Sequence, residues 1–156
     1  FARAQNKDGI AQYNEVWNSQ SLNSGQSMPC GGGDIGLNVW VEKGELYFYI
    51  ARSGVFDENN TMLKAGRVHI SIFPNPLNGG SFKQQLLLQN GSVQIDAAHK
   101  GLKAQVKIWV DVFRPVIHVT VSSNKAVKTE AAFESWRYKD RAVTGRENNQ
   151  GSWKFS

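Results

Sequence analysis

The feature that most constrains the fold is an alternation of apolar and polar residues that recurs along most of this 156-residue chain. In residues 35–42, Ile35, Leu37, Val39 and Val41 share one parity, and polar or aromatic residues occupy the other. A period of two is the pattern of a β-strand with one face against a core. The same pattern predicts further strands at residues 13–17, 45–52, 66–73, 83–89, 92–98, 102–113, 115–122 and 128–137.

Turn-forming residues separate these segments. Asn90–Gly91 is the strongest hairpin signal, because a type I′ turn needs positive φ at both central positions. Lys43–Gly44 predicts a second two-residue hairpin, and His99–Gly101 predicts a three-residue one. No segment carries a convincing helical period. The sequence therefore predicts an all-β fold, an antiparallel β-sandwich.

Two longer connections interrupt this meander, at residues 18–34 and 53–66. Long loops on a rigid sheet are common positions for binding residues. We interpret residues 1–156 as one sandwich domain or part of a larger supersandwich, with an N-terminal extension at 1–11 and a poorly patterned C-terminal segment at 141–156. The chain begins with phenylalanine rather than methionine, from which we expect a removed leader or a trimmed N-terminus.

Gly31, Gly33 and Gly36 match G-x-G-x-x-G, the spacing of a dinucleotide-binding turn. That turn needs an apolar strand before the glycines and, after them, a helix whose N-terminus holds the pyrophosphate. Here a polar stretch ending in Pro29 precedes the glycines, and the strand pattern of 35–42 follows. No Gly-Lys-Ser/Thr follows either, so we predict neither a dinucleotide site nor a P-loop.

The net charge of +5 does not predict a nucleic-acid partner, because the lysines and arginines are dispersed rather than gathered in a basic stripe. No apolar run approaches the ~18 residues of a membrane span. Cys30 is the single cysteine, which excludes an internal disulfide and a cysteine-based zinc site. A thiol nucleophile beside the glycine run is an alternative that we disfavour.

Asp57, Glu58 and Asn59 lie in the second long connection, where carboxylate and amide groups suit a sugar or Ca²⁺. An Asx-turn that closes the loop is the simpler interpretation. Glu130 and Glu134 share one strand parity, but solvated positions explain them better than the acid and base of a glycosidase. The sequence therefore identifies no catalytic residue.

His69, His99 and His118 show no metal-ligand spacing, and the first and last lie in strands whose opposite parity is apolar. We expect these two on polar or partly covered sheet faces, and we predict neither a metal nor a cofactor. The serines show no nucleophile-elbow pattern.

Aromatic residues are more informative, because several lie in strands whose opposite parity is also apolar. They are Trp40, Tyr47, Tyr49, Trp109, Phe113 and Trp136. A strand that is apolar on both faces is covered on both faces, by a further layer or by another domain. The alternative is that exposed rings stack on sugars.

The stretch that begins "YNEVWNSQSLNSGQSMPCGGGDIGLNVW", with "VKIWVDVFRPVIHVTVSS" and "ESWR" later, resembles an N-terminal β-sandwich domain family of unknown function from bacterial glycoside hydrolases. Its "MP-x-G-x-GDIG" segment is also similar to the glycine loop of α-L-fucosidase-like and maltose-phosphorylase-like enzymes. In those enzymes a β-supersandwich precedes an (α/α)6 catalytic barrel. The likeness covers residues 12–137.

The resemblance implies that residues 28–36 form a glycine-rich loop that faces the helical barrel. Asp34 would hydrogen-bond this loop. The chain departs from the family pattern at Cys30, where leucine is common, and at Gly32, where relatives often have asparagine. The residues implied at the substrate cleft or interdomain contact are Gly31, Gly32, Gly33, Asp34 and Gly36.

From the resemblance we expect a non-catalytic N-terminal domain of an extracytoplasmic bacterial enzyme, periplasmic or secreted. It would brace a C-terminal catalytic (α/α)6 domain of the same protein and lend loops to its carbohydrate cleft. The alternatives are a self-sufficient carbohydrate-binding module and a structural interaction domain without a ligand. The residues that we expect to contact a sugar are Asp57, Glu58, Asn59, Trp40, Trp136 and Arg137.

Overall fold

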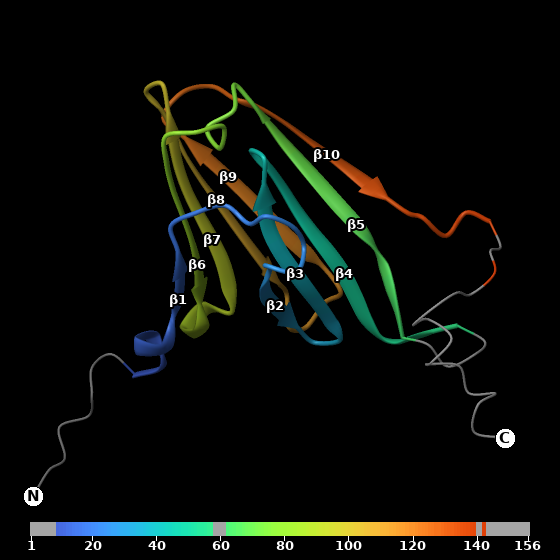
Figure 1. Ribbon diagram of the computed structural model, residues 1–156. Helices are drawn as coiled ribbons and strands as arrows, with labels where there is room; N and C mark the ends of the chain where they lie inside the picture. The colour runs from blue at the N-terminus through green and yellow to red at the C-terminus, as the bar shows by residue number, and fades with distance from the viewer. Residues whose placement is uncertain (1–8, 58–61, 140–141, 143–156) are drawn as a thin grey trace, which may run out of the picture.

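The computed structural model describes residues 9–57, 62–139 and 142, and it confirms the predicted all-β fold. Two antiparallel five-stranded sheets lie face to face as a β-sandwich (Figure 1). Two short 3₁₀ helices are η1 (Gly9–Tyr13) and η2 (Leu88–Asn90). The strands are β1 (Glu15–Trp17), β2 (Met28–Gly32), β3 (Ile35–Glu42), β4 (Glu45–Phe56), β5 (Met62–Phe73), β6 (Ser81–Leu87), β7 (Ser92–His99), β8 (Leu102–Val110), β9 (Ile117–Ser123) and β10 (Lys128–Glu134).

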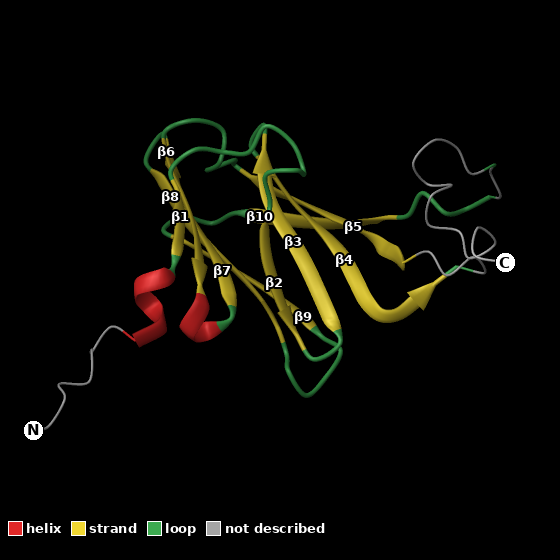
Figure 2. Ribbon diagram, turned by 60° about the horizontal axis from the view of Figure 1, so that its bottom comes forward, coloured by secondary structure: helices red, strands yellow, loops and turns green. Residues whose placement is uncertain are grey.

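The chain crosses between the sheets three times. Sheet A has the strand order β1-β6-β7-β8-β9, and sheet B has the order β10-β5-β4-β3-β2. The two layers and the short helices beside β1 are visible from below the sandwich (Figure 2). Because β10 follows β9 but belongs to sheet B, the last described strand ends up beside β5 at the sheet's edge.

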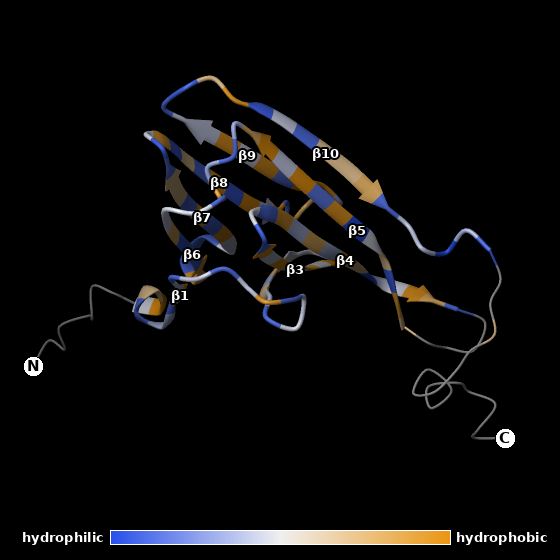
Figure 3. Ribbon diagram, turned by 45° about the horizontal axis from the view of Figure 1, so that its top comes forward, coloured by the Kyte–Doolittle hydropathy of each residue, from blue (hydrophilic) through white to orange (hydrophobic). Residues whose placement is uncertain are grey.

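The core lies between the sheets and uses the predicted alternation. Leu37, Val39 and Val41 of β3 are almost fully buried in one cluster with Ile95 of β7 and Ile108 of β8. Figure 3 shows hydrophobic and hydrophilic positions alternating along the strands. Each fully buried aliphatic side chain contributes about 1.5–3 kcal/mol relative to its exposed state, so this cluster is the main stabilising feature.

The hairpin turns differ in part from the prediction. Lys43–Gly44 forms the predicted two-residue turn, with φ angles of 52° and 78°. Lys100–Gly101 forms a second one, with φ angles of 49° and 77°, because His99 pairs with Leu102. The predicted three-residue turn is therefore wrong. The two positive φ angles are those that a type I′ turn requires.

The prediction of a two-residue turn at Asn90–Gly91 is also wrong. The connection between β6 and β7 has four residues, which form η2 and place Gly91 in the left-handed region. The backbone N–H of Leu88 donates to the side chain of Asn14, at 2.9 Å. This contact from a segment distant in sequence stabilises the wider turn.

Both predicted long loops are shorter than expected. Residues 28–32 of the first form β2, and most of the second is taken up by β4, which runs to Phe56, and β5, which starts at Met62. The pairing of β4 with β5 shifts register on both sides of Ala51. The proline and glycines of β2 give no period of two, so the sequence pattern did not reveal this strand.

The chain ends are described only in part. Residues 9–11 of the predicted N-terminal extension belong to η1, and residues 1–8 lie outside the described residues. Of the predicted C-terminal segment at 141–156, the structure describes residue 142 alone. Within the described ranges, no helix has the length and apolar character needed to cross a membrane.

Candidate functional site

The outer face of sheet B carries a cluster of aromatic and ionisable side chains. They come from alternate positions of β3, β4, β5 and β10 and from the residues after β10. The other positions of β3, β4 and β5 contribute to the core. Because neighbouring strands are in register, these side chains form rows across the sheet. We call the following set the outer-face cluster: Trp40, Glu45, Tyr47, Tyr49, Arg67, His69, Ser71, Glu134 and Trp136.

A row of stacked rings runs through the outer-face cluster. Trp40 stacks on Tyr47 with ring centroids 5.3 Å apart, and Tyr47 stacks on His69 at 4.6 Å. Tyr49 makes a tilted contact with Trp40 at 4.9 Å and an edge contact with Trp136 at 5.9 Å. Trp40 is 1% exposed. The ring of Tyr47 is therefore packed between protein side chains rather than presented to a sugar.

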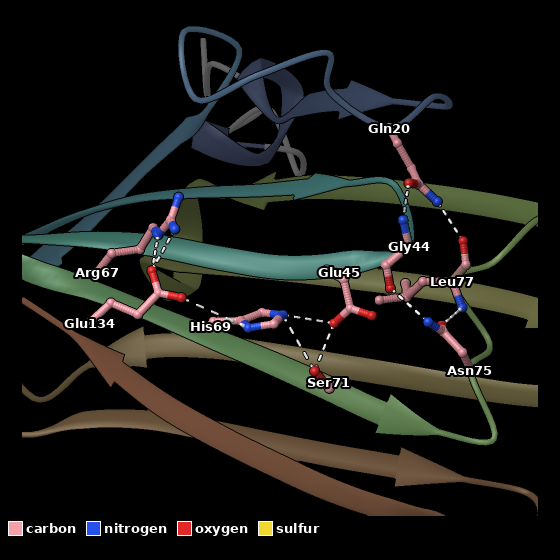
Figure 4. Close-up of polar contacts among 9 residues, drawn as sticks. All are labelled: Gln20, Gly44, Glu45, Arg67, His69, Ser71, Asn75, Leu77 and Glu134. Atoms are coloured by element: carbon pink, nitrogen blue, oxygen red, sulfur yellow. Dashed lines mark hydrogen bonds and ion pairs between the residues drawn. The ribbon is translucent and has the colours of Figure 1, made fainter.

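His69 lies between two carboxylates (Figure 4). Its Nε2 is 2.8 Å from Oε2 of Glu45, and its Nδ1 is 4.0 Å from Oε1 of Glu134. The Ser71 hydroxyl donates to the same Glu45 oxygen, at 2.8 Å, and lies 3.4 Å from Nε2. An ionised carboxylate only accepts, so Nε2 carries the proton and cannot act as a base toward Ser71.

Arg67 and Glu134 close the cluster on the side of β10. The Nε of Arg67 donates to Glu134 at 2.6 Å. Burial alone would lower the pKa of Arg67, but the hydrogen bond and charge of Glu134 outweigh it and raise that pKa. Burial also raises the pKa of Tyr47, and the charge of Glu45 adds to this effect. The ionisable groups of the cluster thus interact with one another.

The Lys43–Gly44 turn, at the end of the same sheet, is braced by two amide side chains (Figure 4). Gln20 accepts from the Gly44 N–H at 2.8 Å and donates to the carbonyl of Leu77 at 2.5 Å. Asn75 donates to the Gly44 carbonyl at 2.9 Å and accepts from the Leu77 N–H at 2.8 Å. Two segments distant in sequence, at Gln20 and at Asn75–Leu77, are therefore tied to this turn.

The glycine run forms a hairpin of β2 and β3 at the other end of sheet B, not the predicted loop. A Cβ on Gly31 would lie 2.8 Å from the Ile35 carbonyl oxygen, and one on Gly32 would lie 2.8 Å from that of Val110. Gly33 has a φ of +58° in the turn. These glycines therefore serve close backbone approach and a left-handed turn.

Gly36 is different, since a Cβ there would meet nothing within 4 Å. It completes the G-x-G-x-x-G pattern by coincidence of spacing. Its φ is not in the left-handed region. Gly32 occupies a position that the motif leaves unspecified, yet unlike Gly36 it has a close backbone neighbour.

Asp34 lies in the turn of this glycine hairpin and pairs with Arg52 of β4. The Nε of Arg52 donates to Asp34 at 2.7 Å, and both side chains are exposed. The hydrogen bond from Arg52 lowers the pKa of the Asp34 carboxyl below its ordinary value. The backbone carbonyl of Asp34 also accepts from the Ser53 N–H at 2.9 Å, so the turn is fixed to the sheet.

An exposed apolar turn lies against the glycine hairpin, and the sequence pattern missed it. β8 ends at Val110 instead of Phe113, and the turn that follows exposes 95% of Phe113 and 65% of Val112. Local contacts hold the turn: Asp111 accepts from the Phe113 N–H at 2.9 Å and pairs with Arg114 at 2.7 Å. The N–H of Phe113, with Arg114, lowers the pKa of Asp111. We call Val112, Phe113 and Val116 the apolar tip.

The aspartate at 111 and Pro115 were the signals that could have identified this turn, because both residues favour turns over strand interiors. A Cβ on Gly33 would lie 3.1 Å from the Val112 carbonyl oxygen, which shows how closely the hairpin and the apolar tip pack.

The acidic loop of the sequence prediction is described only at its first residue. Asp57 follows β4 and is half-buried, whereas Glu58 and Asn59 lie outside the described residues. Trp136 is 40% exposed, and the Arg137 guanidinium lies over its ring, 5.4 Å from the centroid. The structure therefore brings Trp136 and Arg137 together after β10.

Cys30 contributes to the core rather than to a reactive site. Its side chain is 8% exposed, and Sγ lies 3.2 Å from the Gly91 carbonyl oxygen. Burial raises the pKa of this thiol, which disfavours the nucleophilic thiolate. In the described part of the chain, no three His, Cys, Asp or Glu side chains are arranged to hold a metal ion.

Comparison with known families places the chain in one of them. Residues 16–156 match DUF5703_N, a family described as a domain of unknown function (DUF5703). No curated protein matches the chain. The match covers most of the chain, including every strand except the first residue of β1. The protein therefore belongs to the DUF5703 N-terminal domain family.

Proposed function

We propose that this chain is a non-catalytic β-sandwich domain that docks, through the apolar tip and the glycine hairpin, onto another domain of the same protein. The partner is an (α/α)6 glycoside hydrolase barrel of a secreted or periplasmic bacterial enzyme. The observation that carries the docking is Phe113, which is 95% exposed on a turn that is hydrogen-bonded through Asp111 and Arg114.

An exposed aromatic side chain on a hydrogen-bonded turn is well suited to an interface. Binding removes its apolar surface from water and orders little that was mobile, so the entropic cost of association is small. Val112 and Val116 extend the same apolar surface. The glycines bring the hairpin backbone close to it, since Gly32 and Gly33 leave room for no side chain against β8 and the turn after it.

The non-catalytic role is supported by the outer-face cluster. Its carboxylates are engaged with His69, Ser71 and Arg67, which leaves no free acid and base pair there. The choice of a helical glycosidase barrel as partner rests on the resemblance of the segment at 28–36 to enzymes of that architecture. The glycine hairpin would then form part of the rim of the substrate cleft.

The test is calorimetric unfolding of the parent enzyme with Phe113→Asp. We expect the substitution to split one cooperative transition into two, because a charge at the apolar tip prevents docking. Leu22→Asp is the matched control, since Leu22 is 77% exposed in the connection between β1 and β2. Both variants of the isolated chain should unfold at the wild-type temperature. An unsplit transition in the Phe113 variant would refute docking at this tip.

Calorimetric titration of the isolated chain with mono- and oligosaccharides distinguishes the docking domain from a sugar-binding module. The docking proposal expects no saturable heat, because the rings of the outer-face cluster are packed against one another. Saturable binding, lost in Trp136→Ala, would instead identify a self-sufficient carbohydrate-binding module.

A further inference from the structure

β10 forms an edge strand of sheet B. Its seven residues pair with β5 without a register shift, and among the described residues no strand pairs with its other side (Figure 1). It contains no proline or bulge, and its protection against other strands comes from the charges of Lys128, Glu130 and Glu134, which favour only a partner strand of matching charge. By contrast, β1 has three residues, and β2 carries Pro29 and two glycines. β9 is free as well, but it carries no lysine or carboxylate that would select a partner's register.

We propose that β10 pairs in antiparallel orientation with β10 of a second copy of this chain. The two B sheets would then join into one continuous sheet across a two-fold axis. The edge N–H and C=O groups of β10 supply the hydrogen bonds of such strand addition, and the side chains select the register.

The charges of β10 fit this pairing. With the two-fold axis at Ala131, Lys128 lies opposite Glu134 of the second copy, and the contact occurs twice. Both belong to the outer-facing set of β10, at opposite ends of the strand. Lys128 is 73% exposed and pairs with Glu130 at 2.5 Å, while Glu134 is 36% exposed beside Arg67. Opposite charges at directly paired positions favour the register.

Other registers are disfavoured by the same residues. A shift of two residues in one direction places Glu130 opposite its own copy, and a shift in the other direction places Glu130 opposite Glu134. Like charges at paired positions are destabilising. A shift of one residue places the outer face of one copy opposite the inner face of the other, because side chains alternate between faces.

The inner face adds an apolar contact. Phe133 is 63% exposed, and its ring lies on Gly66 of β5, where any Cβ would collide with it. In the register centred on Ala131, Phe133 lies opposite Thr129 of the second copy, which would cover part of the exposed ring. Aromatic and β-branched residues in such pairs stabilise antiparallel strands.

Sedimentation velocity of this chain over a range of concentrations tests the proposal. We expect a reversible dimer. In the Lys128→Glu variant a carboxylate lies opposite Glu134 at both contacts, and in the Glu134→Lys variant a lysine lies opposite Lys128 at both contacts. Each variant should therefore dimerise at least about tenfold more weakly. An equimolar mixture should regain the wild-type affinity, because both contacts are then again between opposite charges.

Lys103→Glu is the control for net charge, since this exposed residue lies on β8 in sheet A. It should dimerise like the wild type. A monomeric wild type, a Lys128 variant with unchanged affinity, or a mixture that fails to recover would each overturn the proposal. Circular dichroism establishes that the variants are folded, and the recovery in the mixture requires Glu134→Lys to be folded despite the lost contact with Arg67.

Discussion

The ring of Tyr47 on β4 lies almost parallel to the imidazole of His69 on β5, with centroids 4.6 Å apart and planes 16° from parallel. The two residues are direct cross-strand partners. The guanidinium of Arg67 lies over the same tyrosine ring, 4.9 Å from its centroid. Tyr47 therefore contacts a residue on each neighbouring strand: Trp40 on β3, and His69 and Arg67 on β5.

Tyr47→Ala should lower the free energy of unfolding by about 2 kcal/mol, because it removes the stacking on Trp40 and His69 and the cation–π contact with Arg67. Tyr47→Phe keeps the ring and should change stability by less than about 0.5 kcal/mol. Urea unfolding measures both. Equal losses in the two variants would show that the hydroxyl, not the stacked ring, is what matters.

Gly32→Ala should destabilise the fold by about 1–3 kcal/mol, because its Cβ would lie 2.8 Å from the Val110 carbonyl oxygen and the hairpin would have to move. Gly36→Ala is the matched control in the neighbouring strand, where a Cβ meets nothing within 4 Å. It should be neutral within about 0.5 kcal/mol. Thermal and urea unfolding of the pair provide the comparison, and equal stability would contradict the close approach of β2 to β8.

Asn75→Ala should cost about 1–2 kcal/mol, because it removes one bond to the Gly44 carbonyl and leaves the Leu77 N–H without its acceptor. Asn78→Ala, at an exposed position of the same connection, should have little effect. Amide hydrogen exchange offers a local measure: protection of the Leu77 N–H should fall in the first variant and persist in the second.

The depressed pKa of Asp34 makes a contribution to stability that depends on pH. A carboxyl with a lowered folded-state pKa stabilises the fold above its unfolded pKa, and the contribution is lost as pH falls through the folded value. Arg52→Gln removes the hydrogen bond that lowers this pKa, so the Asp34 titration should move up toward the ordinary range of an aspartate. Carboxyl-detected NMR titration measures it.

Arg114→Gln is the control for that titration. It should raise the pKa of Asp111 only in part, since the Phe113 N–H, the larger cause of that lowered pKa, is retained. The Asp34 titration should be unaffected. A shift of both carboxyls in either variant would show that net charge, not the specific partner, sets these pKa values.

Cys30 should react with a thiol reagent at the rate of unfolding or local opening, because its Sγ is buried between the sheets and burial raises its pKa. In denaturant the same thiol should react quickly. Rapid and complete modification of the folded chain would contradict the buried position of β2.

Much of the fold could be predicted from single segments of the sequence. The period of two in residues 35–42 identified both a strand and its core face, and Leu37, Val39 and Val41 are buried as expected. The Lys43–Gly44 turn was predicted because its positive φ angles are a local requirement. Local patterns succeed where the residue itself sets the backbone geometry or the buried face.

The candidate interface could not be predicted in this way. The exposure of Phe113 depends on where β8 ends, and that depends on how Asp111 bonds its neighbours. The roles of Gly31 and Gly32 depend on backbone that approaches them from β3 and β8. A motif search assigned importance to Gly36, which has no such neighbour.

The sequence by itself determined that this chain forms antiparallel strands with one buried parity, since alternation and turn chemistry act over a few residues. The tertiary structure decided which strands are neighbours, and so it placed Tyr47 against His69, Glu134 beside Arg67 and β10 at the edge of the described sheet B. The reason is physical: hydrophobic burial specifies a face without specifying a partner, whereas stacking, ion pairing and strand addition require two segments to meet in one register.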